Sequence, residues 1–189
     1  MKRHLLALAL LLVLPLAAEA GSFVYDGWIL YNTDIVMLNF TLNNDATNVR
    51  IWTDSFMNGQ NFDPMLAVFG PDGTLLAQND DDPNVGPNQT YWDAGLVFPT
   101  LAAGNYKCAL TAYWNFANGP NLSDGFELDG TQPVPIEQWW AGGAGYWRAN
   151  FDGVDNASPV PEPATAGLLG IGLASMGLLA SRGFRKKNR

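Results

Sequence analysis

The residues best suited to chemistry in this sequence lie in one acidic turn, the run Asn-Asp-Asp-Asp at 79–82. Carboxylate and amide oxygens packed this closely suit Ca²⁺, which takes six to eight oxygen ligands. Asp63 and Asp93 stand before and after the turn, where neighbouring strands could bring them close to it. The alternative interpretation is an exposed turn that water alone solvates. The predicted calcium ligands are Asp63, Asn79, Asp80, Asp82 and Asp93.

Composition excludes several classes of enzyme. The chain has one histidine, His4, and one cysteine, Cys108, which excludes Ser-His-Asp and Cys-His nucleophiles and a zinc site of Cys and His. Paired carboxylates can still hydrolyse glycosides, so a secreted carboxylate-dependent glycosidase stays as a third candidate function. Glu127 and Glu137 are the only glutamates between residues 21 and 160, and no spacing marks them as a pair. We therefore expect a protein without enzymatic activity.

Tryptophan suggests a second kind of site. All seven tryptophans lie between the two ends of the chain, and Trp139 and Trp140 are adjacent. Neighbouring side chains of a strand point to opposite faces, so both indoles cannot point inward from one sheet. An exposed indole near Asp and Asn can stack on a sugar, which makes a carbohydrate-binding module the alternative function. The simpler interpretation is a loop folded back over an open sheet face.

Short strands must position these residues. Apolar residues recur at every second position in 36–42 and in 49–53, which is the period of a half-buried strand. Pro71-Asp72-Gly73 predicts the turn of a hairpin, and two further strands lie around Ala103-Gly104-Asn105. Cys108 falls on the apolar face of the later strand, so we expect a buried thiol. The pattern predicts an all-β fold, an antiparallel jelly-roll-like β-sandwich without long helices between the two ends.

One stretch of this region resembles a known family. The run FDPMLAVFGPDGTLLAQNDDD, followed by LAAGNYKCALTAYWNFANGPNLSDGF, is similar to the bacterial pre-peptidase C-terminal domain, most clearly over residues 48–126. The resemblance implies a β-sandwich of the kind attached to secreted enzymes or carried alone on surface proteins. It implies a fold more than a function. Residues 130–156 lie beyond the match, and they either close the sandwich or form a long surface loop.

Residues 1–20 have the three parts of a secretory signal peptide. Lys2 and Arg3 give a basic start, an apolar run follows, and Ala18-Glu19-Ala20 supplies small residues for cleavage after Ala20. The apolar core has about 12 residues, too few to span a bilayer. We therefore expect a cleaved signal peptide rather than a retained membrane helix.

Residues 158–189 form a second targeting segment. Its centre, 164–180, has no charge and no proline, and it is just long enough to cross a membrane as a helix. Residues 181–189 are basic, and Lys and Arg stay on the cytoplasmic side of a membrane. This order favours a transmembrane helix with a stop-transfer tail over a buried core helix. The tail's positive charges are Arg182, Arg185, Lys186, Lys187 and Arg189.

Val160, Pro161, Glu162 and Pro163 stand directly before the apolar run. Proline fixes φ and lacks an N–H, so these residues predict a stiff, extended strip that a protease can bind. The strip, the apolar run and the basic tail together resemble the PEP-CTERM sorting signal of Gram-negative bacteria. The resemblance implies that exosortase, a membrane transpeptidase-like enzyme, removes the span and passes the protein toward the cell surface or the exopolysaccharide matrix.

Between the targeting segments, residues 21–157 are expected to form one domain. Two of the chain's 18 acidic residues lie in the end segments, so sixteen remain here against Arg50, Lys107 and Arg148. This excess of negative charge excludes nucleic acid as a partner, because phosphate binding needs clustered Lys and Arg. We predict a non-enzymatic surface or exopolysaccharide-matrix protein, anchored in the inner membrane with its domain in the periplasm until exosortase acts.

Overall fold

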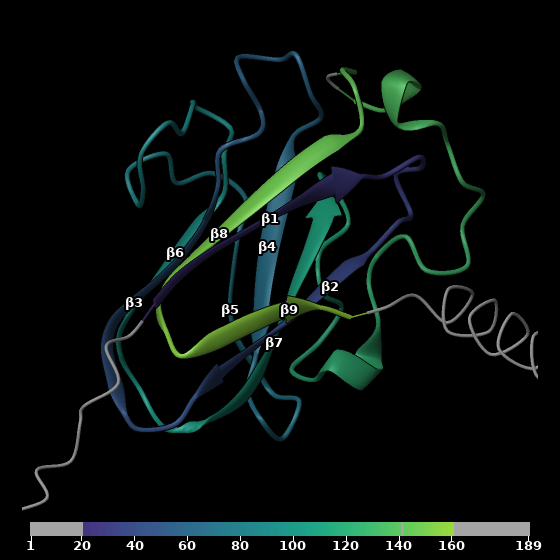
Figure 1. Ribbon diagram of the computed structural model, residues 1–189. Helices are drawn as coiled ribbons and strands as arrows, with labels where there is room; N and C mark the ends of the chain where they lie inside the picture. Colours follow the sequence, from purple (N-terminus) through teal and green to yellow (C-terminus); the bar gives the residue numbers. More distant parts are fainter. Residues whose placement is uncertain (1–20, 141, 161–189) are drawn as a thin grey trace, which may run out of the picture.

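The computed structural model describes residues 21–140 and 142–160, which form two antiparallel β-sheets packed as layers (Figure 1). The predicted signal peptide, the residues 161–163, the apolar run and the basic tail lie outside the described residues. Within residues 21–140 and 142–160, no helix has the length and apolar character needed to cross a membrane. The described chain confirms the predicted all-β fold.

The strands cross repeatedly from one sheet to the other. Every connection does so except the hairpin between β4 and β5, which is the chain path of a jelly roll. The four-stranded sheet runs in the order β1 (Gly21–Trp28), β8 (Tyr146–Val154), β3 (Ala46–Thr53) and β6 (Gly95–Leu101). The five-stranded sheet runs in the order β5 (Leu75–Asn79), β4 (Pro64–Phe69), β7 (Gly104–Ala112), β2 (Val36–Leu42) and β9 (Asn156–Pro159).

The main core lies between the two sheets, and alternating side chains build it. Phe40 of β2 stacks on Tyr106 of β7, with ring centroids 4.9 Å apart, and meets Phe151 of the other sheet at 5.8 Å. Each such side chain stabilises the fold by about 1.5–3 kcal/mol through burial. The predicted inward faces of 36–42 and 49–53 are confirmed, and Cys108 is fully buried as expected.

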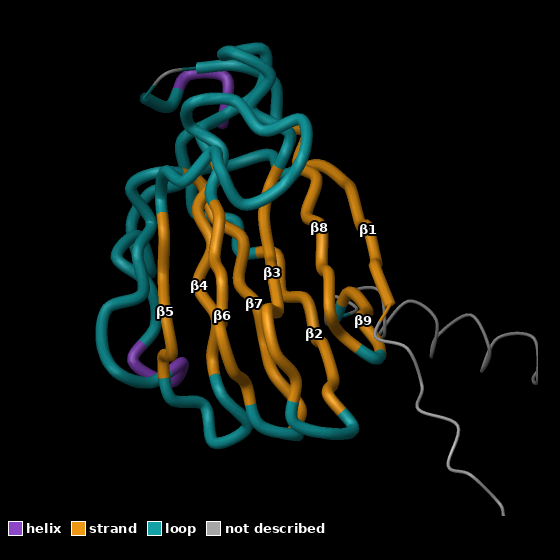
Figure 2. The backbone as a smooth tube through the Cα atoms, turned by 90° about the vertical axis from the view of Figure 1, so that its left-hand side faces the viewer, coloured by secondary structure: helices purple, strands orange, loops and turns teal. Residues whose placement is uncertain are grey.

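A second apolar layer covers the outer face of the five-stranded sheet. Ala117 and Phe126, from the segment after β7, pack against Ala67 and Phe69 of β4. All six residues of β4 are therefore buried, because both faces of this strand are covered. The covering segment contains two 3₁₀-helices, η1 (Leu122–Asp124) and η2 (Ile136–Gln138), which lie near opposite ends of the sandwich (Figure 2). Within the described residues, these two short 3₁₀-helices are the helical segments. No long helix occurs there, which confirms the prediction.

The sequence left open whether residues 130–156 close the sandwich or form a long surface loop, and in the structure they do both. Its first part is a long loop that carries η2, and its last part is β8. Strand β8 pairs with β1 on one side and β3 on the other, so it closes the four-stranded sheet. The chain thereby brings Phe23 opposite Phe151, a pairing that joins distant parts of the sequence.

The β4–β5 hairpin positions the acidic turn. The N–H of Gly70 donates to the carbonyl of Thr74 over 2.8 Å, and Gly73 has a φ of 86°, a value that favours glycine. The predicted turn at 71–73 is thus confirmed. Leu66 lies opposite Asn79 in the antiparallel register. Residues that precede β4 therefore lie beside residues that follow β5, at the end of the hairpin away from the turn.

Strand β9 holds the end of the described chain against β2. Pro159 lies opposite Leu38, and the N–H of Val160 donates to the carbonyl of Met37 over 2.8 Å. The folded body therefore continues to Val160, three residues past the predicted domain end at 157. Val160 is bound to the sheet, so an unpaired strip can begin only at Pro161.

Candidate functional site

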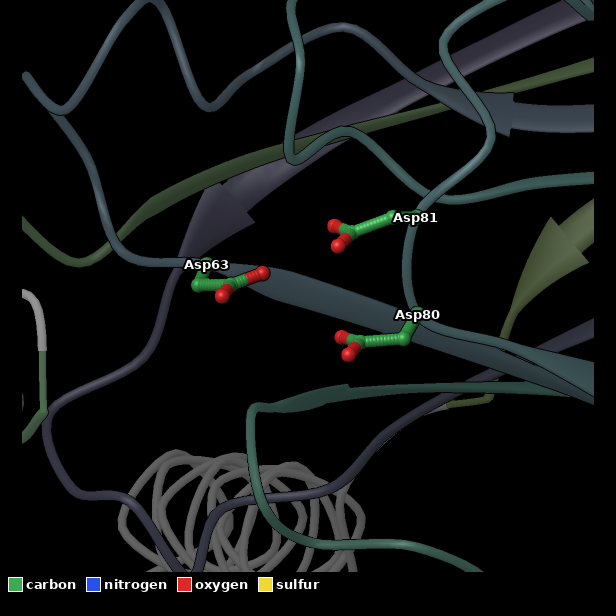
Figure 3. Close-up of side chains that lie close together, drawn as sticks. All are labelled: Asp63, Asp80 and Asp81. Atoms are coloured by element: carbon green, nitrogen blue, oxygen red, sulfur yellow. The ribbon is translucent and has the colours of Figure 1, made fainter.

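Three carboxylates converge at the open end of the β4–β5 hairpin. Asp63 precedes β4, whereas Asp80 and Asp81 follow β5. One carboxylate oxygen from each lies within 4.8 Å of the others. Figure 3 shows the three side chains pointing toward a common space. We call Asp63, Asp80 and Asp81 the acidic cluster.

The acidic cluster combines burial with like charge. Asp63 is only 7% exposed, and its Oδ1 atom is buried without a hydrogen-bond partner. Burial, followed by the charges of Asp80, Asp81 and Asp93, raises the pKa of Asp63 to about 8. Burial and then the charge of Asp81 raise the pKa of Asp80 to about 6, and burial also raises the pKa of Asp81. A buried carboxylate is destabilised unless something neutralises it or donates hydrogen bonds to it.

Asp93, one of the predicted ligands, has a different and structural role. Its Oδ1 accepts hydrogen bonds from Thr53 Oγ1 at 3.0 Å, from the N–H of Ser55 at 2.9 Å and from the N–H of Phe56 at 3.1 Å. Its Oδ2 accepts from the N–H of Thr90 at 2.7 Å and from Thr90 Oγ1 at 3.0 Å. The three bonds to Oδ1 join the end of β3 and the residues after it to the turn before β6, whereas the two bonds to Oδ2 lie within that turn. Together they occupy both oxygens.

The other two predicted ligands are also committed elsewhere. Asn79 Oδ1 accepts from the N–H of Gly95 over 2.9 Å, and Asp82 Oδ1 accepts from the N–H of Asn84 over 3.2 Å. The backbone of Asp82 is fixed as well, because its carbonyl accepts from Gln89 Nε2 at 3.0 Å. The structure thus brings Asp63 and Asp80 together with Asp81, a neighbour that the sequence prediction passed over.

Both arginines of the described residues lie against acids outside the acidic cluster. Arg50 pairs with Asp152, and Arg148 lies 3.6 Å from Asp54. Lys107 is exposed in the middle of β7. Among residues 21–140 and 142–160, the ion pairs therefore leave the acidic cluster without a basic partner.

Exposed aromatic rings lie next to the acidic cluster. Trp114 and Trp140 are 48% and 64% exposed, and their ring centroids lie 6.5 Å apart. Tyr113 contacts both, at 5.6 Å from Trp114 and 5.1 Å from Trp140. We call Tyr113, Trp114 and Trp140 the aromatic patch. The acidic cluster acts electrostatically on this patch. Burial raises the pKa of the Tyr113 phenol most, and the charges of Asp80, Asp63 and Asp81 raise it further.

The two adjacent tryptophans have opposite environments. Trp139 packs against the main core, and its Nε1 donates to the carbonyl of Tyr113. Trp140 is exposed on the aromatic patch. Its patch partner Trp114 was not singled out in the sequence, because the contact depends on how the loop around η2 returns to the end of β7. The only sequence signal for it was an aromatic run, Tyr-Trp-Asn-Phe, directly after β7.

Comparison with known proteins identifies the C-terminal segment. The PEP-CTERM protein-sorting motif matches residues 159–187. No curated protein matches the chain. The motif begins at Pro159, the last residue of β9, so it starts where the β-sandwich ends. Its presence implies an exported protein that is processed at the membrane by exosortase.

Proposed function

We propose that this chain is a non-enzymatic protein of the cell surface or the exopolysaccharide matrix, delivered there by exosortase. The observation that carries the proposal is the sorting motif at 159–187, placed directly after a folded β-sandwich. The charge of the sandwich suits an extracellular surface protein, because a strong net charge keeps a protein soluble. The resemblance of residues 48–126 to the pre-peptidase C-terminal domain agrees with such a role.

Processing is tested with the full chain in its natural host. Mass spectrometry of the surface-released protein should show a C-terminus at or before Pro163, and the form in an exosortase deletion strain should retain the tail. Replacing Pro161 and Glu162 together by Ala should likewise keep the protein in the membrane, whereas Glu137→Ala, an exposed change in the domain, should not. A surface-released form that ends at Arg189 would contradict the proposal.

A second candidate function is carbohydrate binding by the aromatic patch. Two indoles exposed side by side are uncommon on a surface without a ligand, since large apolar groups are generally buried. Indole faces offer a flat apolar surface for a sugar ring, and Asp81, the exposed member of the neighbouring acidic cluster, offers carboxylate oxygens to hydroxyl groups. We propose that polysaccharide of the matrix stacks on Trp114 and Trp140.

Glycan-array binding tests this second candidate. Trp114→Ala and Trp140→Ala should each weaken binding about fivefold or more, because one stacking contact on an aromatic ring contributes about 1–3 kcal/mol and about 1.4 kcal/mol corresponds to tenfold. Trp28→Ala is the matched control, since Trp28 is 66% exposed but contacts Tyr146 instead of the patch. Equal loss with the control would contradict a role for the patch. Release of sugar fragments by the purified protein would instead support a glycosidase.

A further inference from the structure

We propose that the acidic cluster of Asp63, Asp80 and Asp81 binds a calcium ion. The residues come from both ends of the β4–β5 hairpin, so the ion would join the segment before β4 to the segment after β5. This site differs from the one that the sequence predicted, because Asp81 joins Asp63 and Asp80 in the cluster, whereas Asn79, Asp82 and Asp93 each accept hydrogen bonds on a side-chain oxygen elsewhere.

Buried oxygens without partners carry the proposal. Asp63 is more than nine-tenths buried, and its Oδ1 has no hydrogen-bond donor. Asp80 Oδ1 is a second buried oxygen without a donor. Both side chains point toward the space that they share with Asp81 (Figure 3). Buried polar atoms are nearly always satisfied in native proteins, so two such atoms on adjacent carboxylates point to a bound cation.

The spacing of the oxygens agrees with one shared ion. Ca²⁺ binds oxygen at about 2.3–2.6 Å, so two ligands of one ion lie at most about 5 Å apart. The cluster offers one oxygen from each residue within 4.8 Å of the others. The exposed side of Asp81 leaves room for water to complete the six to eight ligands that Ca²⁺ takes.

The chemistry of the cluster selects the class of metal. All three side chains offer hard carboxylate oxygens, which suit Ca²⁺ and Mg²⁺ rather than zinc. Mg²⁺ requires a near-ideal octahedron and loses water reluctantly, whereas Ca²⁺ accepts an irregular shell. Three carboxylates from two separate segments make an irregular shell. The ion also supplies the positive charge that Arg50 and Arg148, already paired with Asp152 and Asp54, do not supply.

Thermal unfolding of the full chain, purified in detergent and stripped with chelator, tests the proposal. Adding millimolar Ca²⁺ should raise the melting temperature by about 5 °C, because the ion binds only the folded state. Mg²⁺ at the same concentration should raise it less. Titration calorimetry should give one Ca²⁺ per chain, which measures binding independently of unfolding.

Charge-removing variants locate the site. Asp80→Asn combined with Asp81→Asn should abolish the response to Ca²⁺ in both measurements. Asp82→Asn is the matched control, because it removes a charge from the same turn but keeps the acceptor for the N–H of Asn84. The control should keep most of the response.

Three results would overturn the proposal. One is a wild-type melting curve that is the same in Ca²⁺ and in chelator, with no heat of binding. Another is a Ca²⁺ response that survives in the double variant, which would place the ion elsewhere. An equal response to Mg²⁺ would overturn the assignment to calcium.

Discussion

The backbone N–H of Tyr113 donates a hydrogen bond to the backbone carbonyl of Asp63 over 2.9 Å. This bond extends the pairing of β7 with β4 beyond the last paired residues, Pro64 and Ala112. It joins the acidic cluster directly to the aromatic patch. We therefore expect a ligand that fixes Asp63 to fix Tyr113 as well, and with it the indoles of Trp114 and Trp140.

The proposed sugar site on the aromatic patch and the proposed calcium site in the acidic cluster together predict that carbohydrate binding depends on calcium. Chelation should weaken glycan binding severalfold, because loss of the ion loosens Asp63 and with it Tyr113. Glycan titrations with and without Ca²⁺ measure the effect, and the Asp80→Asn, Asp81→Asn double variant should bind weakly in both conditions. Identical glycan affinity in Ca²⁺ and chelator would show that the patch and the cluster act independently.

Cys108 should not react with thiol reagents in the folded protein. The side chain is fully buried, and burial raises its pKa to about 12, so almost no thiolate is available to react. A colorimetric thiol assay should detect no reactive group under native conditions and one after denaturation. Rapid native labelling would contradict the position of Cys108 in the main core.

Asp152 should stabilise the fold at neutral pH but not in acid. Hydrogen bonds from Ser22 and Arg50 hold the pKa of its carboxyl group below the ordinary value. Such a group contributes stability above its unfolded-state pKa and loses it as the pH falls through the folded-state pKa. Urea unfolding should give Asp152→Asn a free energy of unfolding about 1 kcal/mol below that of the wild type at pH 7. This gap between variant and wild type should close below about pH 4. A gap of equal size at pH 3 would contradict this.

Phe151→Ala should destabilise the sandwich strongly. The ring lies between the two sheets against Phe40, and its removal leaves a cavity that neighbouring strands cannot close. The expected loss is about 3–5 kcal/mol, measured by urea denaturation of the full chain in detergent. Val97→Ala, an exposed change on β6, should stay within about 1 kcal/mol of wild type. Similar losses for both variants would contradict the assigned core.

The sequence predicted those parts of the fold that depend on local patterns. The hairpin around 71–73 and the inward faces of β2 and β3 follow from turn residues and from alternation. Strands β1 and β8 were not predicted, because glycines such as Gly27 and Gly153 interrupt their patterns and their pairing joins opposite ends of the domain. Long-range pairing of this kind has no local signal.

The sequence predicted the region of the candidate site but not its full set of residues. Asp63 and Asp80 were found because a hairpin brings together the segments on either side of it. Asp82 was predicted as a ligand and Asp81 was not. In the structure Gln89 binds the carbonyl of Asp82 and the N–H groups of Val85 and Gly86, and this side-chain network sets the path of the turn.

The attachment of Val160 to β2 makes the tether of this protein very short. Only three residues, 161–163, separate the last bound residue from the apolar run that the sequence predicts to span the membrane. Fully extended, they reach about 10 Å, which is no more than the width of one helix with its side chains. With that run in the membrane, as the sequence predicts, a soluble protease would have little room between the folded body and the lipid. We therefore expect the length of the tether, as well as its composition, to favour cleavage by an enzyme whose active site lies at the membrane surface.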